Sequence, residues 1–400
     1  MENGITAVLS EFLRIPSIPD NLAAYKASAE FLRNLMNEAG LTHVRVVEYA
    51  KNKPVVMGTL PGLTQAGTAP LESVLLSGHY DVVPAEPAKW EVHPFSGEVR
   101  GDRLYGRGAQ DMKSVLVQYI YSVKRIIKEG IRFPRSLYIV CFPDEEVGGA
   151  DGVRLFLESE EFKRMNVGLV FDEGLASEHD AFKLFYGERA INYVKIKVSG
   201  PTGHGSRFVQ NTAVENLTKI LGNIYKVRTL QENMCTCGNK KLGDVMTLNV
   251  TSIHAASLGH NVIPSEAQCV VDIRVPLDIP SLEEYIKREI LENSEPLIEA
   301  TQIEFIQKTV HPEIDCGKSP WLEKIKSAIE AQGETVDLEV FPAATDSRFY
   351  RAVKGLPCFG FSPIKNTPIL LHDHNEWISV EGLEKGVNVY CQLLKNILVD

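Results

Sequence analysis

The sequence predicts an α/β fold in which a mostly parallel sheet is flanked by helices and a smaller α+β domain is inserted. The chain has 400 residues, 44% of them hydrophobic and 24% charged, which is the size and composition of a globular protein of two or three domains. Helix and strand patterns alternate up to about residue 187, change character near residue 190, and return after about residue 310. We therefore expect one domain from residues 1–187 and 311–400, and an inserted domain from residues 188–310.

The first part of the chain carries the pattern of a sheet covered on both faces. Apolar residues at helical spacing predict helices over 23–39 and 111–129, and glycines follow both segments. Short apolar runs bounded by turn residues predict buried strands at 74–76, 136–142 and 167–171. Buried strands separated by helices are typical of a parallel sheet.

The inserted part begins with a strand of a different kind. In residues 193–199, Val194, Ile196 and Val198 alternate with lysines, which predicts a strand with one wet face. The segments after it predict the order β-α-β-β-α-β, as in a ferredoxin-like unit. Beyond it, a helix at 319–332, two strands and a final helix at 380–397 return to the α/β pattern.

Charge and composition narrow the choice of partner and compartment. The formal net charge is −10, which argues against nucleic acid or an anionic membrane surface as a partner. No apolar run has the length of a membrane span, and the first residues lack the basic start and apolar core of a signal peptide. Seven scattered cysteines fit reduced thiols. We therefore expect a cytoplasmic protein with no membrane partner.

Titratable residues follow the predicted strands at the points where the strands end. Because ligands bind at the carboxyl ends of strands in an open α/β sheet, we expect these side chains to meet at one edge. They are His79 and Asp81, the pair Glu145 and Glu146, Glu173, Asp111 at a helix start, and His372 and His374 late in the chain.

This set of side chains predicts a metal centre. Neighbouring carboxylates such as Glu145 and Glu146 repel each other near a core, so a cation should accompany them. Imidazoles with carboxylates suit a pair of divalent ions, with zinc the first candidate. Taken singly, each signal also fits a surface histidine, a solvated glutamate pair or a turn, and only their joint occurrence favours the metal. These residues alone do not choose between His372 and His374 as a ligand.

Several stretches together resemble the zinc-dependent metallopeptidase superfamily, which includes carboxypeptidases, dipeptidases and aminoacylases. They are "HYDVVP", "YGRGAQDMK", "PDEEVGG", "FDEG", "TGHGSRF", "NVIP", "AATDSRF" and "LLHDHNE", and the similarity to the aminoacylases runs from about residue 10 to 395. The resemblance implies two Zn²⁺ per subunit. It implies His79, Asp111, Glu146, Glu173 and His372 as metal ligands, with Asp111 bridging, Glu145 as general base and Asp81 as the carboxylate that orients His79.

The resemblance also assigns roles outside the metal ligands. It implies that the inserted domain is a lid that forms a homodimer, and that His204 stabilises the oxyanion in the active site of the other subunit. The residues around His204, taken alone, favour an ordinary surface-loop histidine. Substrate-binding positions implied in the same way are Asn261, Arg274, Thr345 and Arg348.

The expected activity is hydrolysis of N-acyl-L-amino acids to a free L-amino acid and a carboxylate. A metallo-dipeptidase or carboxypeptidase of the same superfamily is the alternative, because the metal chemistry is the same and the sequence does not map the acyl pocket. A non-catalytic binding protein on this scaffold is a third reading. It should have lost the base or a ligand, and this chain retains Glu145 and every implied ligand.

Overall fold

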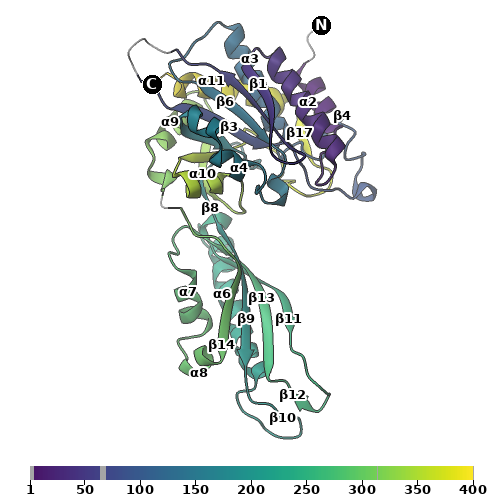
Figure 1. Ribbon diagram of the computed structural model, residues 1–400, viewed down its shortest axis with the longest axis vertical. Coiled ribbons are helices and arrows are strands. Elements are labelled where there is room, and N and C mark those ends of the chain that lie inside the picture. The colour runs from purple at the N-terminus through teal and green to yellow at the C-terminus, as the bar shows by residue number, and fades with distance from the viewer. Residues whose placement is uncertain (1–3, 64–68, 313, 400) are drawn as a thin grey trace. The chain divides into compact units, whose positions relative to one another are not determined.

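The computed structural model describes residues 4–63, 69–312 and 314–399, which divide into two compact units (Figure 1). Unit 1 comprises Met1–Gly187, Pro312–Glu339 and Thr345–Asp400, and unit 2 comprises Glu188–His311 and Val340–Ala344. The sequence placed residues 340–344 in the first domain. They group with unit 2 because Arg189 binds them: its backbone N–H donates to Phe341 O (3.1 Å) and its Nε donates to Pro342 O (2.8 Å).

Unit 1 is built on an eight-stranded sheet in the order β1-β2-β6-β3-β7-β16-β8-β15. The pairs β6–β3, β3–β7 and β7–β16 are parallel, whereas β1–β2, β2–β6 and β16–β8 are antiparallel, so the prediction of a largely parallel central sheet is confirmed. The strands are β1 (Thr42–Ala50), β2 (Lys53–Leu60), β3 (Ser73–His79), β6 (Leu137–Phe142), β7 (Val167–Asp172), β8 (Phe182–Glu188), β15 (Val336–Phe341) and β16 (Cys358–Phe361).

Helices cover both faces of this sheet. Successive side chains of a strand point to opposite faces, so a buried strand contributes to an apolar cluster on each side. Val74 and Leu76 pack into one apolar cluster, and Leu75 between them packs into the other. The first cluster includes residues of α1 (Ile5–Leu13), α2 (Leu22–Glu38), α3 (Lys113–Lys128), α9 (Pro320–Glu330) and α11 (Val380–Ile397). The second includes α4 (Val153–Glu158), α5 (Glu160–Met165) and α10 (Ser347–Lys354).

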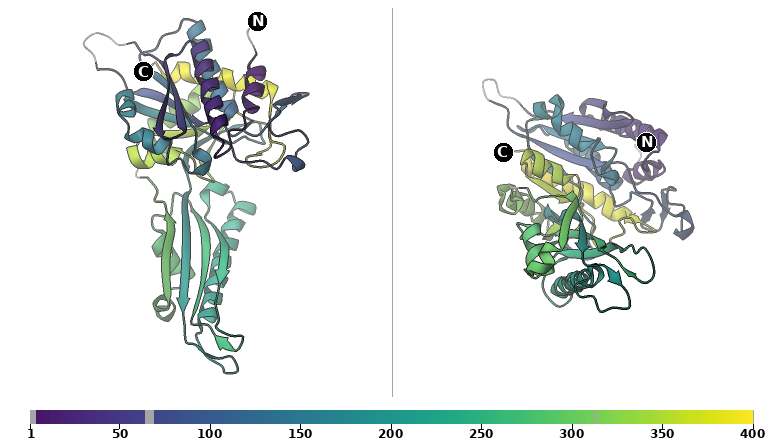
Figure 2. Two further views of the ribbon diagram at one scale, coloured as in Figure 1. Left: turned by 45° about the vertical axis from the view of Figure 1, so that its right-hand side comes forward. Right: turned by 60° about the horizontal axis from the view of Figure 1, so that its bottom comes forward.

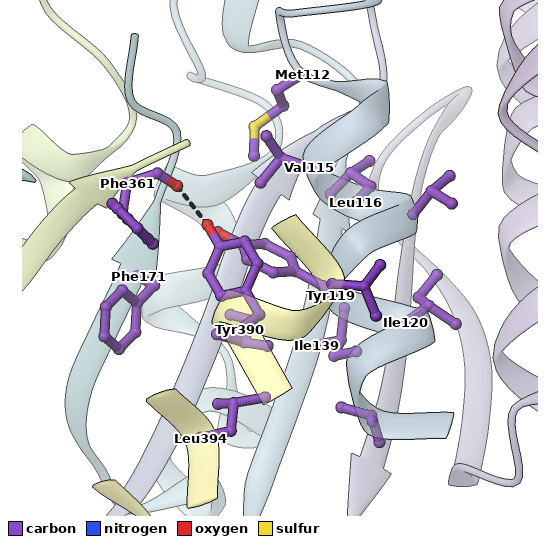
Figure 3. Close-up of a cluster of buried hydrophobic side chains, with 14 of the residues drawn as sticks. Met112, Val115, Leu116, Tyr119, Ile120, Ile139, Phe171, Phe361, Tyr390 and Leu394 are labelled. Atoms are coloured by element: carbon purple, nitrogen blue, oxygen red, sulfur yellow. Dashed lines mark hydrogen bonds between the residues drawn. The ribbon is translucent and has the colours of Figure 1, made fainter. Parts of the chain in front are cut away.

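The centre of the larger cluster is a seam between α3, α11 and the sheet (Figure 3). Tyr119 of α3 and Tyr390 of α11 meet edge to face with ring centroids 4.8 Å apart. The Tyr390 hydroxyl donates to the backbone carbonyl of Phe361 at the end of β16. These contacts pack α3 against the sheet. Asp111 lies two residues before the first residue of this helix.

Shorter elements complete unit 1. A three-stranded antiparallel sheet in the order β17-β5-β4 joins the end of the chain to the segment before α3. Its strands are β4 (Glu98–Arg100), β5 (Arg103–Tyr105) and β17 (Trp377–Ser379), and the 3₁₀ turns are η1 (Pro87–Lys89), η2 (Glu145–Val147) and η5 (Cys316–Lys318).

Unit 2 has a four-stranded antiparallel sheet in the order β11-β13-β9-β14. Numbered along the chain this order is 2-3-1-4, the topology of the predicted ferredoxin-like unit. In Figure 2, α6 lies along one face, and every second residue of β9 from Ala190 to Val198 is buried. The elements are β9 (Ala190–Ser199), α6 (Ala213–Thr236), η3 (Leu242–Asp244), β11 (Thr247–His254), β13 (Glu266–Val275), α7 (Leu282–Tyr285), the π-helical turn η4 (Ile286–Ile290), α8 (Glu295–Glu299) and β14 (Thr301–Lys308).

A short two-stranded ribbon extends unit 2. It pairs β10 (Gly203–His204) with β12 (Val262–Ile263), so that His204 lies opposite Val262. In the portion of the chain that the structure describes, no helix is both long enough and apolar enough to cross a membrane.

Candidate metal centre

Three neighbouring strands of unit 1 deliver the predicted side chains to one sheet edge. β6, β3 and β7 are adjacent and parallel, so their carboxyl ends coincide. His79 is the last residue of β3, and Glu173 follows β7 directly. Glu145 begins the η2 turn three residues after β6 ends at Phe142. Residues separated by almost a hundred positions in sequence are therefore neighbours in space.

Asp111 lies between the two histidines. Its Oδ1 is 3.0 Å from His79 Nε2, and its Oδ2 is 3.3 Å from His372 Nε2. A second carboxylate approaches the same nitrogen of each imidazole: Glu173 Oε2 is 3.5 Å from His79 Nε2, and Glu146 Oε2 is 3.1 Å from His372 Nε2. The arrangement is two histidine–carboxylate pairs that share one aspartate.

The structure distinguishes the two histidines of the late loop. His372 Nε2 faces Asp111 and Glu146, whereas no ion pair or side-chain hydrogen bond involves the His374 ring within residues 314–399 or the other described ranges. His372 has a φ of 60°, a left-handed conformation that a non-glycine residue adopts at a cost. The loop geometry thus points this imidazole into the carboxylate cluster.

Glu145 and Asp81 complete the cluster in ways that the sequence did not specify. Ligand atoms of Glu145, His79 and Glu173 all lie within 4.8 Å of one another. The His79 Nδ1 contacts the backbone carbonyl of Asp81 at 3.0 Å, and the Asp81 carboxylate is farther, at 3.5 Å. That carboxylate instead accepts hydrogen bonds from Glu145 N (3.2 Å) and Glu146 N (3.1 Å). Asp81 therefore holds the His79 ring through its backbone and the η2 turn through its side chain.

Burial and mutual repulsion shift the pKa values of the carboxylates. Burial raises the pKa of Glu173 well above its usual value, and the charges of Asp111 and Glu145 raise it further. Burial also raises the pKa of Glu145 and of Glu146. Asp111 is the exception: burial favours a raised pKa, but hydrogen bonds from His372 and His79 outweigh it and lower the pKa.

The histidines respond in the opposite direction. Hydrogen bonds to Asp111 and Glu146 raise the pKa of His372 to about 10. Burial alone would lower the pKa of His79, but the Glu173 charge and hydrogen bonds to the carboxylates raise it well above its usual value. Without a metal ion, these two imidazoles are the groups that carry the compensating positive charge.

The donor set fits a pair of divalent cations. Across the described ranges, no lysine or arginine forms an ion pair with Asp111, Glu145, Glu146 or Glu173, so four carboxylates share only two imidazoles as charge partners. Buried carboxylates are stable when they are paired or bind metal. Imidazole nitrogen with carboxylate oxygen is a set of donors that suits zinc.

Thr345 and Arg348 lie in unit 1, in the loop before α10 and the first turn of that helix. Arg348 Nη1 donates to Thr345 O (2.7 Å), and its Nη2 donates to Gly148 O (3.0 Å), just after the η2 turn. The two predicted substrate-binding residues are thus joined to each other and to the segment that carries Glu145 and Glu146.

The other predicted residues lie in unit 2. Asn261 Nδ2 is 3.2 Å from His204 Nε2, so the structure brings these two together. Ser206 N–H donates to His204 Nδ1 (3.2 Å). Arg274 forms a two-pronged ion pair with Asp272, at 2.7 Å and 3.1 Å.

Two buried residues beside the cluster were not singled out by sequence. Glu376 contacts the segment that ends in Asp111, and Gln110, which belongs to that segment, contacts Pro368 and Trp377. Both residues lie in stretches that carry the family resemblance, but neither was given a role, because their partners lie more than 250 residues away in the chain.

Known proteins are similar to this chain in sequence. Residues 75–396 match the peptidase family M20/M25/M40. Aminoacylase-1 of Dictyostelium discoideum is 36% identical, covering 99% of this chain and 98% of its own length, and aminoacylase-1 of Mus musculus is 36% identical, covering 98% and 95%. A probable carboxypeptidase S-like 1 of Dictyostelium discoideum is 29% identical over 82% of this chain and 73% of its own length.

Solved structures agree on the fold. An M20-family metallo-carboxypeptidase from Sulfolobus solfataricus aligns with a TM-score of 0.70 at 17% identity, covering 98% of this chain and 99% of that one. A dinuclear metal-binding M20 peptidase from Bacillus subtilis aligns with a TM-score of 0.67 at 15% identity, covering 98% and 97%. The predicted resemblance to the metallopeptidase superfamily is confirmed, and the chain belongs to peptidase family M20/M25/M40.

Proposed function

We propose that the protein hydrolyses the amide bond of N-acyl-L-amino acids, such as N-acetyl amino acids, with two zinc ions per chain. The observation that carries the proposal is the cluster of two histidines and four carboxylates, in which Asp111 contacts both imidazoles and no lysine or arginine of the described residues takes part. The choice of substrate class is supported by the aminoacylase-1 relatives, which align over nearly the whole chain.

Five of these residues would hold the two metal ions, and a sixth would act as the base. His79 and Glu173 would hold one ion, His372 and Glu146 the other, and Asp111 both. When bound, the ions would lower the pKa of a water molecule and polarise the carbonyl of the scissile amide. Glu145 would take a proton from the attacking water and return it to the leaving nitrogen as the C–N bond breaks. The products are a carboxylate and a free L-amino acid.

Residues of unit 2 would act on the substrate. Ser206 N–H donates to His204 Nδ1, and His204 Nε2, which faces Asn261 in this structure, would donate to the oxyanion that forms at the attacked carbonyl. We assign this role to His204 of one chain in the active site of a second chain. Asn261 and Arg274, with Thr345 and Arg348 of unit 1, would bind the polar groups of the substrate, since a guanidinium suits a carboxylate.

The assembly and compartment belong to the same proposal. A homodimer formed through unit 2 would bring His204 to the second chain, and no nucleic acid or membrane is required. All seven cysteines are free thiols, as expected of a protein in the reducing cytoplasm.

The direct test is the release of acetate from N-acetyl-L-methionine. Activity should vanish when a chelator removes the metal and return on addition of zinc, and the Glu145→Gln variant should bind metal yet remain inactive. If the zinc-loaded protein hydrolyses neither N-acyl amino acids nor dipeptides, the proposed function is wrong.

A dipeptidase or carboxypeptidase activity is the second candidate, favoured by the similarity to a probable carboxypeptidase. A matched pair of substrates separates the two: N-acetyl-L-methionine and L-alanyl-L-methionine release the same amino acid, but only the dipeptide carries a free ammonium group. We expect the larger kcat/KM for the acetylated substrate, and the opposite ranking would identify a dipeptidase.

A further inference from the structure

The carboxylate of Glu376 is fully buried and turned toward the segment that carries Asp111. A fully buried glutamate needs charge and hydrogen-bond partners, because an unpaired carboxylate is costly to desolvate. Its Oε2 accepts from Arg107 Nη1 at 2.8 Å and from Gly108 N at 3.0 Å. Its Oε1 accepts from Gln110 N at 2.7 Å and from Asp111 N at 3.3 Å. One carboxylate therefore holds the backbone of three residues in the loop 106–111, hereafter the Asp111 loop.

Gln110 makes the reciprocal contacts with the loop 368–377, hereafter the His372 loop. Its Nε2 donates to Pro368 O (3.0 Å) and to Trp377 O (2.9 Å), and its Oε1 accepts from Leu370 N (3.1 Å). The amide side chain of Gln110 therefore bridges the first and last residues of the loop. The backbone adds one more bond, from Gly106 N to Glu376 O (3.0 Å).

These contacts matter because the two loops carry a shared aspartate and the histidine that faces it. The His372 side chain is 54% exposed, so packing does little to fix it. By contrast, His79 and Glu173 are buried at the ends of strands β3 and β7. The position of Asp111 relative to His372 thus depends on how the two loops are held together.

We propose that Glu376 and Gln110 are positioning residues that set the distance between Asp111 and His372, and thereby the affinity for the second metal ion. The inference rests on the proposed function, since it requires that these two residues bind an ion. Neither Glu376 nor Gln110 touches the ion or the substrate; both act through the backbone of the loops. Groups that orient metal ligands typically change metal affinity about 10- to 100-fold when they are replaced.

The test is a titration of metal-free protein with Co²⁺, followed by visible absorption and by competition with a chelator. Glu376→Gln keeps the shape of the side chain but replaces one acceptor oxygen with an NH₂ group that cannot accept from a backbone N–H. We expect the first ion to bind with nearly wild-type affinity and the second to bind about 10- to 100-fold more weakly. Gln110→Met, which removes the amide but keeps the length, should weaken the same ion.

Glu334→Gln is the matched control. Glu334 is a mostly buried glutamate of unit 1 that forms ion pairs with Lys365 and Lys385. Its replacement therefore disturbs ion pairs outside both loops. Its variant should bind both ions as the wild type does.

Three outcomes decide the question. Wild-type affinity for both ions in Glu376→Gln would overturn the inference, and so would an equal loss for both ions accompanied by a lower melting temperature, which is the signature of general destabilisation. If Glu376→Gln does not fold, Gln110→Met carries the test. A wild-type protein that binds fewer than two ions would instead contradict the proposed function.

Discussion

Unit 1 contains two clusters of charged side chains, around Glu334 and around Asp111, in which the carboxylates have different charge partners. At Glu334, Lys365 Nζ approaches at 2.6 Å and Lys385 Nζ at 2.7 Å. Around Asp111, the charge partners among the described residues are the imidazoles of His79 and His372. Burial alone would raise the pKa of Glu334, but its two lysines lower it, whereas the pKa of Glu173 is raised well above its usual value.

The difference shows which acidic cluster needs a ligand. The Glu334 cluster is complete within the protein, since each charge has a partner of opposite sign. In the Asp111 cluster four carboxylates face two imidazoles, and binding of divalent cations would balance the carboxylates. Buried carboxylates that have no lysine or arginine partner are therefore candidates for metal ligands.

Metal removal should separate the two clusters most strongly. We expect a chelator to abolish hydrolysis and to lower the apparent stability, because an ion that binds only the folded chain stabilises it by about 4 kcal/mol at a concentration 1,000 times its Kd. The measurement is activity and melting temperature with and without chelator and with zinc restored. Unchanged activity in fully metal-free protein would remove the distinction between the clusters.

Replacing Glu145 by Gln should have the next largest effect. General acid–base catalysis typically contributes about 10²- to 10⁴-fold, so kcat should fall by that factor. The number of bound zinc ions should not change, because Glu145 is assigned as the base and not as a ligand. Elemental analysis of the same preparation is the control, and loss of zinc would show that Glu145 is a ligand.

Asp81→Asn should have an intermediate effect. The Asp81 carboxylate accepts from the backbone of both Glu145 and Glu146, and an amide has only one oxygen to do so. We expect metal affinity or kcat to fall about 10- to 100-fold while the far-ultraviolet circular dichroism is retained. Kinetics and metal content equal to those of the wild type would mean that the carboxylate does not position the η2 turn.

Glu334→Gln should have the smallest effect and should not alter catalysis. Loss of the hydrogen bonds from Lys365 and Lys385 should lower the free energy of unfolding by about 1–2 kcal/mol at pH 7. The folded-state pKa of Glu334 is lowered, so this contribution exists above the unfolded-state pKa and disappears as the pH falls through the folded value. Denaturant unfolding at pH 7 and in acid checks this, and a difference that persists in acid would exclude the ion pair as its cause.

The sequence predicted the parts of the fold that have regular patterns. The strand around Val74–Leu76 and the helix over 380–397 both exist, because continuous apolar runs and helical spacing reflect burial directly. No strand was predicted at β1 or β2, and β1 has an irregular mixture of exposed and half-buried residues. The second helix of the predicted β-α-β-β-α-β order exists as α7, but it continues as the π-helical turn η4, which no residue spacing indicates.

The candidate site was only partly accessible to the same reasoning. Strand ends predicted where His79 and Glu173 would meet, since adjacent parallel strands end together. The contacts of Asp111 with two histidines 293 residues apart depend on how loops fold back, and the residues alone left His372 and His374 equal. The stretch "LLHDHNE" contains Glu376, but its contacts with the backbone of residues 108–111 depend on how the loops fold and were not predicted.

The number of zinc ions bound per chain is the most direct test of the proposed metal centre. Metal-free protein titrated with zinc in a calorimeter, with elemental analysis of the reloaded sample, gives this number without reference to any substrate. We expect two ions per chain, and the second should be lost preferentially when His372 is replaced by Ala. Tight binding of no ion, or of a single ion by a fully active protein, would contradict it.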